Sequence, residues 1–435
     1  MNQSTAISHA EAHTGMRNAI LGQSLGIIPI QAFFNGGIII LIMLELSHDP
    51  LLAIIAYNSL HFRSLATLLT ALFARPGSPK QMMLQQWRIA AILLLLIGIL
   101  LLLFKTGWIS IAFIITIYMF QIFGGSGSTY WFPVLQDFVP EDQRGRFFSR
   151  LRASWTIVSL VVVLLLGLFV GENTTQEQYG RMIIGFGLVY LLRNYYIRKL
   201  PELSASIREP NGKPTLKEIW TDILQNKRFL WYLVYIGCFS FFIGSFKPIL
   251  VLYMKQLLNV RDSQNIIISI IGSSGAFMAF LVCGSYVDRV GSRLVFRIAH
   301  LLMAALMLGV SLFPVDFKWL LWALIGANVL IQGMIAAHGV AATSYLFFLM
   351  SGPSRALFTA INIAVISSMM ASSSALSGFL TKYLADFTLS VSGFQFSVFQ
   401  LVFFVSGALL LLALPLTSVI APGRYQLRVT NAPRL

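Results

Sequence analysis

Twelve long runs of apolar residues dominate the sequence and limit what it can fold into. A helix of about 20 apolar residues crosses a hydrocarbon layer about 30 Å thick. Of the 435 residues, 57% are hydrophobic and 11% are charged, whereas soluble domains carry about 25% charged residues. Strand-like alternation separated by short turns is absent from the sequence, which argues against a transmembrane barrel. The sequence therefore predicts an all-α, polytopic membrane protein.

The runs fall into two sets of six, separated by a polar stretch. The predicted spans are residues 19–44, 51–73, 89–104, 109–138, 150–170, 181–198, 229–254, 265–284, 294–313, 319–345, 356–384 and 396–421. The polar stretch contains proline, glycine and charges of both signs, as linkers do. We therefore predict a lead, a six-helix bundle, a linker, a second six-helix bundle and a tail, at residues 1–18, 19–198, 199–228, 229–421 and 422–435.

The net charge of +15 is explained better by membrane topology than by nucleic acid binding, because the basic residues lie mostly between the spans. Of the 31 Lys and Arg residues, 23 fall on the side of the two termini, with Arg193 counted among them, and 6 fall on the other side. This asymmetry predicts cytoplasmic termini in a cytoplasmic (inner or plasma) membrane. The N-terminal lead does not resemble a cleaved signal peptide. The two cysteines, Cys238 and Cys283, lie within spans and are expected to be buried thiols.

Two pairs of similar stretches relate the two sets of spans. The first span contains FFNGG (Phe33 to Gly37), and the seventh contains FFIGS (Phe241 to Ser245) at a similar position. TALFARPGSPK (Thr70 to Lys80) and GSYVDRVGSR (Gly284 to Arg293) each follow the second span of their set. The matching order favours two duplicated, pseudo-symmetric halves, a plan in which transporters place a binding site at the interface of the repeats.

The stretch GSYVDRVGSR resembles the loop signature of the major facilitator superfamily, Gly-x-x-x-Asp-Arg-x-Gly-x-Arg/Lys. It matches that signature at Gly284, Asp288, Arg289, Gly291 and Arg293. The stretch QDFVPEDQRGRFF (Gln136 to Phe148) resembles the family's loop between spans four and five. The first copy of the signature departs from the pattern, since Thr70 and Ala74 replace the first Gly and the Asp, while Arg75, Gly77 and Lys80 remain.

The resemblance implies a cytoplasmic latch in which the second signature holds the start of span five and favours the outward-open state. The residues expected in this latch are Gly284, Asp288, Arg289, Gly291, Arg293, Asp137, Arg144 and Arg146. The carboxylate of Asp288 could interact with the N-terminus of a neighbouring helix, and the glycines would permit a sharp turn. The alternative is a solvated loop whose positive charge only fixes the topology.

The resemblance also implies that spans one, four, seven and ten line a central cavity. Polar residues in three of these spans are then candidates for solute binding: Gln31, Asn35, Gln121, Tyr130, Asn328 and Gln332. Gln31 and Asn35, like Asn328 and Gln332, are separated by one helical turn and share a face. The alternative for these amides is a hydrogen bond to a neighbouring helix, which is common in membrane bundles.

Ionisable residues inside the spans are more specific candidates, because a charge in the bilayer is costly. Arg63 lies in the middle of span two, with His61 on the nearly opposite face, and Lys247 lies in span seven. No Asp or Glu is central in any span of the sequence. This charge pattern favours an anionic or zwitterionic solute, or a proton step through His61. Arg63 and Lys247 could instead have structural partners or extend towards the headgroups.

These features predict a secondary active transporter of a small solute that works by rocker-switch alternating access between the two halves. We expect no nucleotide-dependent step, because the sequence has no GxxxxGK[ST] loop, and no cofactor or metal, although coupling to H+ or another ion is possible. The expected partners are a small molecule and the lipid bilayer, with a monomeric chain. The competing hypotheses are a transporter-like scaffold, sensor or assembly factor, and an intramembrane enzyme, for which the sequence has no HExxH motif and no membrane-facing Asp pair.

Overall fold

The computed structural model describes residues 8–73, 78–105, 107–139, 144–170, 174–201, 221, 224–314, 317–349, 355–385, 387–391 and 394–419. All twelve predicted spans are helical over most of their described residues. The chain divides into two compact units, residues 1–213 with 261–266, and residues 214–260 with 267–435. The predicted lead, linker and tail fall largely outside the described residues, as do Ala74, Arg75 and Gly77 of the first signature copy.

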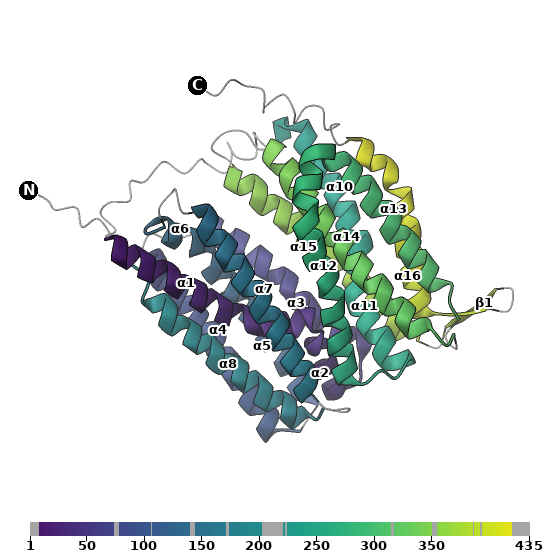
Figure 1. Cartoon of the computed structure of the whole chain (residues 1–435). Coiled ribbons are helices and arrows are strands. Elements are labelled where there is room, and N and C mark those ends of the chain that lie inside the picture. Colours follow the sequence, from purple (N-terminus) through teal and green to yellow (C-terminus); the bar gives the residue numbers. More distant parts are fainter. Residues whose placement is uncertain are drawn as a thin grey trace, which may run out of the picture. The chain divides into compact units, whose positions relative to one another are not determined.

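The first unit is built from helices that run alongside one another (Figure 1). They are α1 (His9–Ile30), η1 (Gln31–Asn35), α2 (Ile38–Ser47), α3 (Pro50–Leu72), α4 (Pro79–Leu103), α5 (Trp108–Thr129), α6 (Trp131–Gln136), α7 (Arg144–Phe169) and α8 (Gln176–Arg198). Helix α4 packs against α5 and α8, α3 packs against α5, and α1 packs against α7 and α8.

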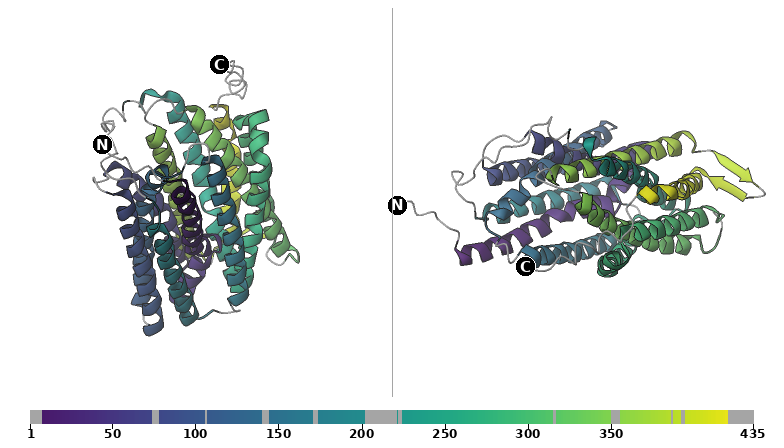
Figure 2. Two further views of the ribbon diagram at one scale, coloured as in Figure 1. Left: turned by 60° about the vertical axis from the view of Figure 1, so that its left-hand side comes forward. Right: turned by 90° about the horizontal axis from the view of Figure 1, so that it is seen from above.

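The second unit is also a helical bundle, with one short hairpin that projects beyond the helix ends (Figures 1 and 2). Its elements are α10 (Lys227–Gly244), α11 (Phe246–Leu252), η4 (Tyr253–Leu257), α12 (Asp262–Val290), α13 (Ser292–Ser311), α14 (Leu320–Leu349), α15 (Arg355–Tyr383), β1 (Thr388–Val391), β2 (Phe394–Ser397), α16 (Val398–Leu412) and η5 (Leu414–Val419). Strands β1 and β2 pair antiparallel. Their aromatic and β-branched residues are common in strands. Residues 396 and 397, which were predicted to begin the twelfth span, belong to this hairpin instead.

Polar residues fix the starts of several helices. Ser8 and Glu11 form a capping box at α1, and Thr175 and Gln178 form one at α8. The Asp49 carboxylate accepts from the backbone N–H of Leu51 at 2.9 Å, which caps α3. Each cap satisfies backbone N–H groups that the first helical turn leaves unpaired. Because of its cap, α1 begins at His9, ten residues before the predicted start of the first span.

The paired stretches FFNGG and FFIGS both mark breaks in their helices. The π-helical turn η1 covers Gln31–Asn35, Gly37 adopts a φ of 70°, and the helix axis bends by 58° before α2. A positive φ of this kind favours glycine. In the seventh span, α10 ends at Gly244 and α11 begins at Phe246. The similar stretches therefore interrupt the first and seventh spans at similar positions.

Eight described helical segments are long and apolar enough to cross a membrane, and the bent pair of α1 with η1 and α2 makes a ninth. The other three predicted spans are α3, α7 and α8, which have 23, 26 and 23 residues. A helix of 23 residues is about 35 Å long, so these three are also long enough. They are less apolar because they carry polar side chains, some of which line the cavity described below.

The signature stretch is more helical than predicted. Helix α12 continues through Gly284 to Val290, and the turn is confined to Gly291, which has a φ of 81°. Helix α13 begins directly after it, at Ser292. Gly284 and Gly291 were both expected to permit a turn, but only Gly291 does so. Gly284 lies within α12, which continues through Ser285 to Val290 because these residues include no helix breaker.

The latch stays a prediction, since several of its side chains lie outside the described residues. These are the side chains of Asp288, Arg144 and Arg146. Arg289 is exposed, and Arg293 and Asp137 are half-buried.

A tight seam joins α3 to α5 in the first unit. A methyl group at Gly125 would overlap the carbonyl oxygen of Arg63, so only glycine allows this approach. Thr67 donates to the Gly125 carbonyl oxygen at 3.0 Å, and Tyr118 donates to the Ile55 carbonyl oxygen at 2.9 Å. Close backbone approach and interhelical hydrogen bonds are what hold helices together in lipid, where apolar burial does not.

We predict that Gly125→Ala destabilises the protein, because the added methyl group forces α3 away from α5. The expected loss is about 1–3 kcal/mol, measured as a lower melting temperature of the purified protein in detergent. Gly185→Ala in α8 is the control, since a methyl group there meets no atom within 4 Å. Equal melting temperatures for the two variants would contradict the seam.

Candidate functional site

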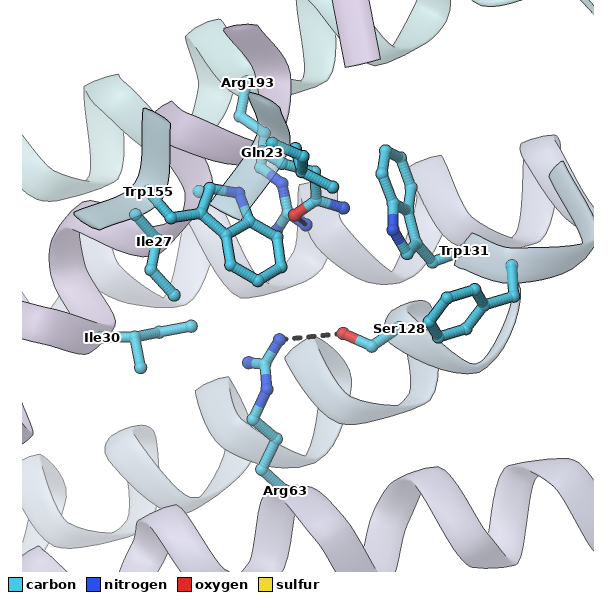
Figure 3. Close-up of a pocket in the computed structure, with 11 residues that line it drawn as sticks. Gln23, Ile27, Ile30, Arg63, Ser128, Trp131, Trp155 and Arg193 are labelled. Carbon is cyan, nitrogen blue, oxygen red and sulfur yellow. Dashed lines mark hydrogen bonds between the residues drawn. The ribbon is translucent and has the colours of Figure 1, made fainter. Parts of the chain in front are cut away.

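A cavity of about 560 Å³ lies inside the first unit. Helices α1, α3, α5, α6, α7 and α8 all contribute to its lining, and Figure 3 shows their side chains around one open space. The lining residues are Gln23, Gly26, Ile27, Ile30, Arg63, Ser128, Trp131, Phe132, Leu151, Trp155 and Arg193. A cavity of this size suits a small organic ligand.

Arg63 reaches the cavity from α3 and is held by α5. Its Nη2 donates to the hydroxyl of Ser128 at 2.8 Å, and its Nη1 lies 3.5 Å from the side-chain oxygen of Gln121. Gly124 provides the space, because a methyl group there would lie 2.5 Å from Nη1 of Arg63. The guanidinium group is thus held by neutral partners.

Arg193 reaches the same cavity from α8 and is only 2% exposed. Its guanidinium carbon lies 3.2 Å from the centre of the Trp87 ring, a cation–π contact, and its Nη2 donates to Gln23 at 3.1 Å. Its Nε and Nη1 atoms have no hydrogen-bond partner among the described residues. A methyl group at Gly26 would overlap its Nε, so α1 must carry glycine where Arg193 passes.

Neither arginine has a carboxylate partner among the described residues, and no acidic residue lines the cavity. The ion pairs seen in the described part of the first unit join Glu177 to Lys105 and Arg181, which are well exposed. Burying a charge is costly unless an opposite charge or hydrogen bonds compensate it. One buried guanidinium group, of Arg193, and one half-buried group, of Arg63, neither with a counter-ion among the described residues, make the cavity strongly attractive to anions.

The remaining walls are mostly apolar and aromatic. In Figure 3 the indole rings of Trp131 and Trp155 stand on either side of the open space. Ile27, Ile30 and Leu151 complete these walls. The indole N–H of Trp155 is buried and has no hydrogen-bond partner among the described residues. The cavity therefore combines unpaired N–H donors with apolar surfaces that an organic molecule could cover.

The structure brings two of the sequence-predicted candidates of the first unit together, Arg63 and Gln121, of which Gln121 is fully buried. His61 is buried on another face of α3 and is not among the lining residues, as its spacing from Arg63 predicts. Gln31 and Asn35 are hydrogen-bonded to each other in η1. Tyr130 is half-buried at the junction of α5 and α6.

The other three candidates belong to the second unit. Lys247 lies in α11 beside Pro248 and is half-buried. Asn328 is buried in α14 and donates to the Ile268 carbonyl oxygen of α12 at 3.2 Å. Gln332, one turn further along α14, is half-buried. For Asn328, the structure thus shows the alternative given in the sequence analysis, a hydrogen bond to a neighbouring helix.

Sequence reasoning missed Arg193, which it counted among the cytoplasmic charges. The correction is that Arg193 is buried inside the bundle, so 22 Lys and Arg residues remain on that side of the count. Gln23, Trp131 and Trp155 were not candidates either. A signal was available, because Arg193 interrupts the apolar run of the sixth span and the first span carries Gly22 and Gly26 one turn apart.

Two units of apolar helices, of which the first contains a charged cavity large enough for a small organic molecule, define a polytopic membrane protein. The sequence model of the Major Facilitator Superfamily matches residues 32–345, well over half of the chain. The chain therefore belongs to this superfamily, which confirms the resemblance carried by GSYVDRVGSR. Members of the superfamily are transporters and not enzymes, so this is a multi-pass membrane transport protein.

Solved transporter structures share the fold at low sequence identity. A mutant of the nucleoside transporter NupG has a TM-score of 0.72 at 13% identity, covering 93% of this chain and 100% of that one. A bacterial homologue of the iron transporter ferroportin, in an inward-facing state, has a TM-score of 0.69 at 15% identity, covering 94% and 98%. The xylose transporter XylE from E. coli, inward open, has a TM-score of 0.64 at 15% identity, covering 94% and 96%. No curated protein matches the chain in sequence.

We predict that Trp87→Leu destabilises the protein more than Trp87→Phe does. Both variants lose the hydrogen bond from the Trp87 indole to the Gly124 carbonyl oxygen, at 3.2 Å. Only the phenylalanine keeps a ring face under Arg193, a contact worth about 2 kcal/mol when desolvated. The melting temperatures of the two purified variants provide the measurement. If the leucine variant melts no lower than the phenylalanine variant, the ring does not stabilise the buried guanidinium group.

Proposed function

We propose that this protein is a secondary active transporter of a small organic anion, zwitterions included, and that the first-unit cavity is part of its solute site. One observation carries the proposal: Arg63 and Arg193 line the same cavity without an acidic partner among the described residues. Their charges need a counter-ion, and a transported anion would supply it during each binding event. Transport would follow rocker-switch alternating access between the two halves.

The cavity walls support an organic anion rather than an inorganic one. An inorganic anion would occupy a small part of the 560 Å³ and leave the apolar walls in contact with water. An apolar body placed between Trp131 and Trp155 would stabilise the complex by about 25 cal/mol for each Å² of apolar surface removed from water. By their names, the solved relatives described above transport a nucleoside, a sugar or a metal. The shared fold therefore does not determine the substrate, which depends on the residues that line the cavity.

The basic residues support a cytoplasmic-membrane orientation with both termini inside. Of the 31 Lys and Arg residues, 22 lie on the side of the termini and 6 on the other side once Arg193 is removed from the count. This asymmetry follows the positive-inside rule. Lys247 in the second unit, half-buried and without a carboxylate partner among the described residues, is a further candidate for anion contact.

We predict that Arg63→Gln weakens the binding of benzoate, a simple organic anion, by about 10- to 100-fold, because a hydrogen bond to a charged group is worth about 1.5–3 kcal/mol. Binding is measured by the quenching of tryptophan fluorescence in detergent, and uptake by labelled benzoate in proteoliposomes. Arg181→Gln is the matched control, since this exposed arginine lies on α8 with Arg193 and pairs only with Glu177 in the described structure. Benzamide is the neutral control ligand. Equal binding of benzoate and benzamide by the unaltered protein would overturn the anion proposal.

For the latch, we propose that Asp288 holds the outward-open state, and we predict that Asp288→Asn shifts the population towards inward-open. The measurement is the labelling of single reporter cysteines at each end of the helices, in a protein whose Cys238 and Cys283 have been replaced by alanine. Labelling at the cytoplasmic end should rise as labelling at the other end falls. Unchanged labelling at both ends would show that the charge in this stretch only fixes the topology.

A further inference from the structure

The number of uncompensated charges in the cavity is the starting point for a narrower inference, which rests on the proposed function. Arg63 and Arg193 each carry one positive charge at all physiological pH values. A singly charged solute neutralises one of them and leaves the other buried without a counter-ion. A head group with two negative charges neutralises both.

The two guanidinium groups are placed so that one head group could contact both. In Figure 3 they point into the same open space from different walls, Arg63 from α3 and Arg193 from α8. Arg63 donates to Ser128, which also lines the cavity, and Arg193 lies against the face of the Trp87 ring. Because these contacts hold them in position, neither needs to reorganise to receive an oxyanion.

The unpaired donors match an acceptor-rich head group. Nε and Nη1 of Arg193 and the indole N–H of Trp155 are buried without a hydrogen-bond partner among the described residues. A monosubstituted phosphate presents three strong acceptor oxygens and a charge of about −1.5 to −2 at pH 7. Guanidinium groups also bind phosphate through paired hydrogen bonds.

We propose that the cavity binds an organic solute through a doubly charged head group of the phosphate-monoester type, held jointly by Arg63 and Arg193. The apolar body of the solute lies between Trp131 and Trp155. The cavity thus selects for two negative charges on one head group, and a monoanion of the same shape binds more weakly.

Phenyl phosphate and phenyl sulfate test this proposal, because they have nearly the same shape but differ in charge. The phosphate monoester loses its second proton at a pKa of about 6, whereas the sulfate monoester stays singly charged. Binding is measured by isothermal titration calorimetry on the purified full chain in detergent, at pH 5 and pH 7.5. At pH 7.5 we expect phenyl phosphate to bind at least about tenfold more tightly, which corresponds to ~1.4 kcal/mol. At pH 5 this preference should largely disappear.

The sulfate also controls for titration of the protein itself. The titratable groups around the two guanidinium groups are Tyr190, which packs against Arg193 on α8, and His61, which lies on α3 with Arg63. Any effect of these groups on the cavity acts on both ligands, and at pH 5, where both ligands are mostly singly charged, it cancels in the ratio of the two affinities. The ratio therefore reports the second charge of the phosphate.

Variants assign the preference to the two arginines. Arg63→Gln and Arg193→Gln should each reduce the preference for phosphate over sulfate to about twofold or less, while Arg181→Gln should leave it unchanged. Arg193 is buried, so its variant could fail to fold, and Arg63→Gln provides the same test on a residue that is less buried.

The outcomes separate this inference from the proposed function. Equal affinities for the two ligands at pH 7.5, or two sulfate molecules bound per chain, would overturn the doubly charged head group and leave the organic-anion function intact. If neither ligand binds, both the inference and the organic-anion function are wrong. A preference for phosphate that persists in both arginine variants would also overturn the inference.

Discussion

Two positive charges inside an apolar helical bundle, with no acidic partner among the described residues, are the constraint on which the rest of the first unit depends. A guanidinium group is tolerated inside a bundle only where neighbouring groups compensate its lost hydration. Here Arg193 makes a cation–π contact with the face of Trp87, and Arg63 donates a hydrogen bond to the hydroxyl of Ser128. The glycines of α1 and α5 follow from the same constraint, since larger residues would occupy the space of the arginines. The bundle therefore maintains a standing positive charge, which is suited to a solute that arrives with the opposite sign.

Much of the architecture was predictable from the sequence, because apolar runs of membrane-crossing length allow few structures besides helices. Arg63 was predictable as a cavity residue because it interrupts such a run near its middle. Arg193 interrupts a run as well but was missed, because it lies near the end of that run and its burial depends on α1, with a contact to Gln23 that joins residues 170 positions apart. The signature stretch shows the opposite error. Its glycines and charges suggested a loop, yet backbone geometry required a turn only at Gly291.

The two halves use their polar residues differently, although their sequences echo each other. In the second unit, the side-chain amide of Asn328 donates to a neighbouring helix, and a ring nitrogen of His338 lies 2.8 Å from the hydroxyl of Tyr235. In the first unit, several N–H donors around the cavity have no partner in the described structure. Internal satisfaction stabilises a bundle, whereas unpaired donors prepare one to bind.

The close fit between Gly26 and Arg193 has a consequence for how such a cavity could diversify. The stem and Nε of Arg193 fill the space that a side chain at position 26 would otherwise take. Bulk at these two positions is therefore interchangeable, and a shorter neutral residue at 193 together with a larger one at 26 would preserve the contact between α1 and α8. Related chains could thus alter the electrical character of the cavity by exchanging volume across one helix contact, without rebuilding the bundle around it.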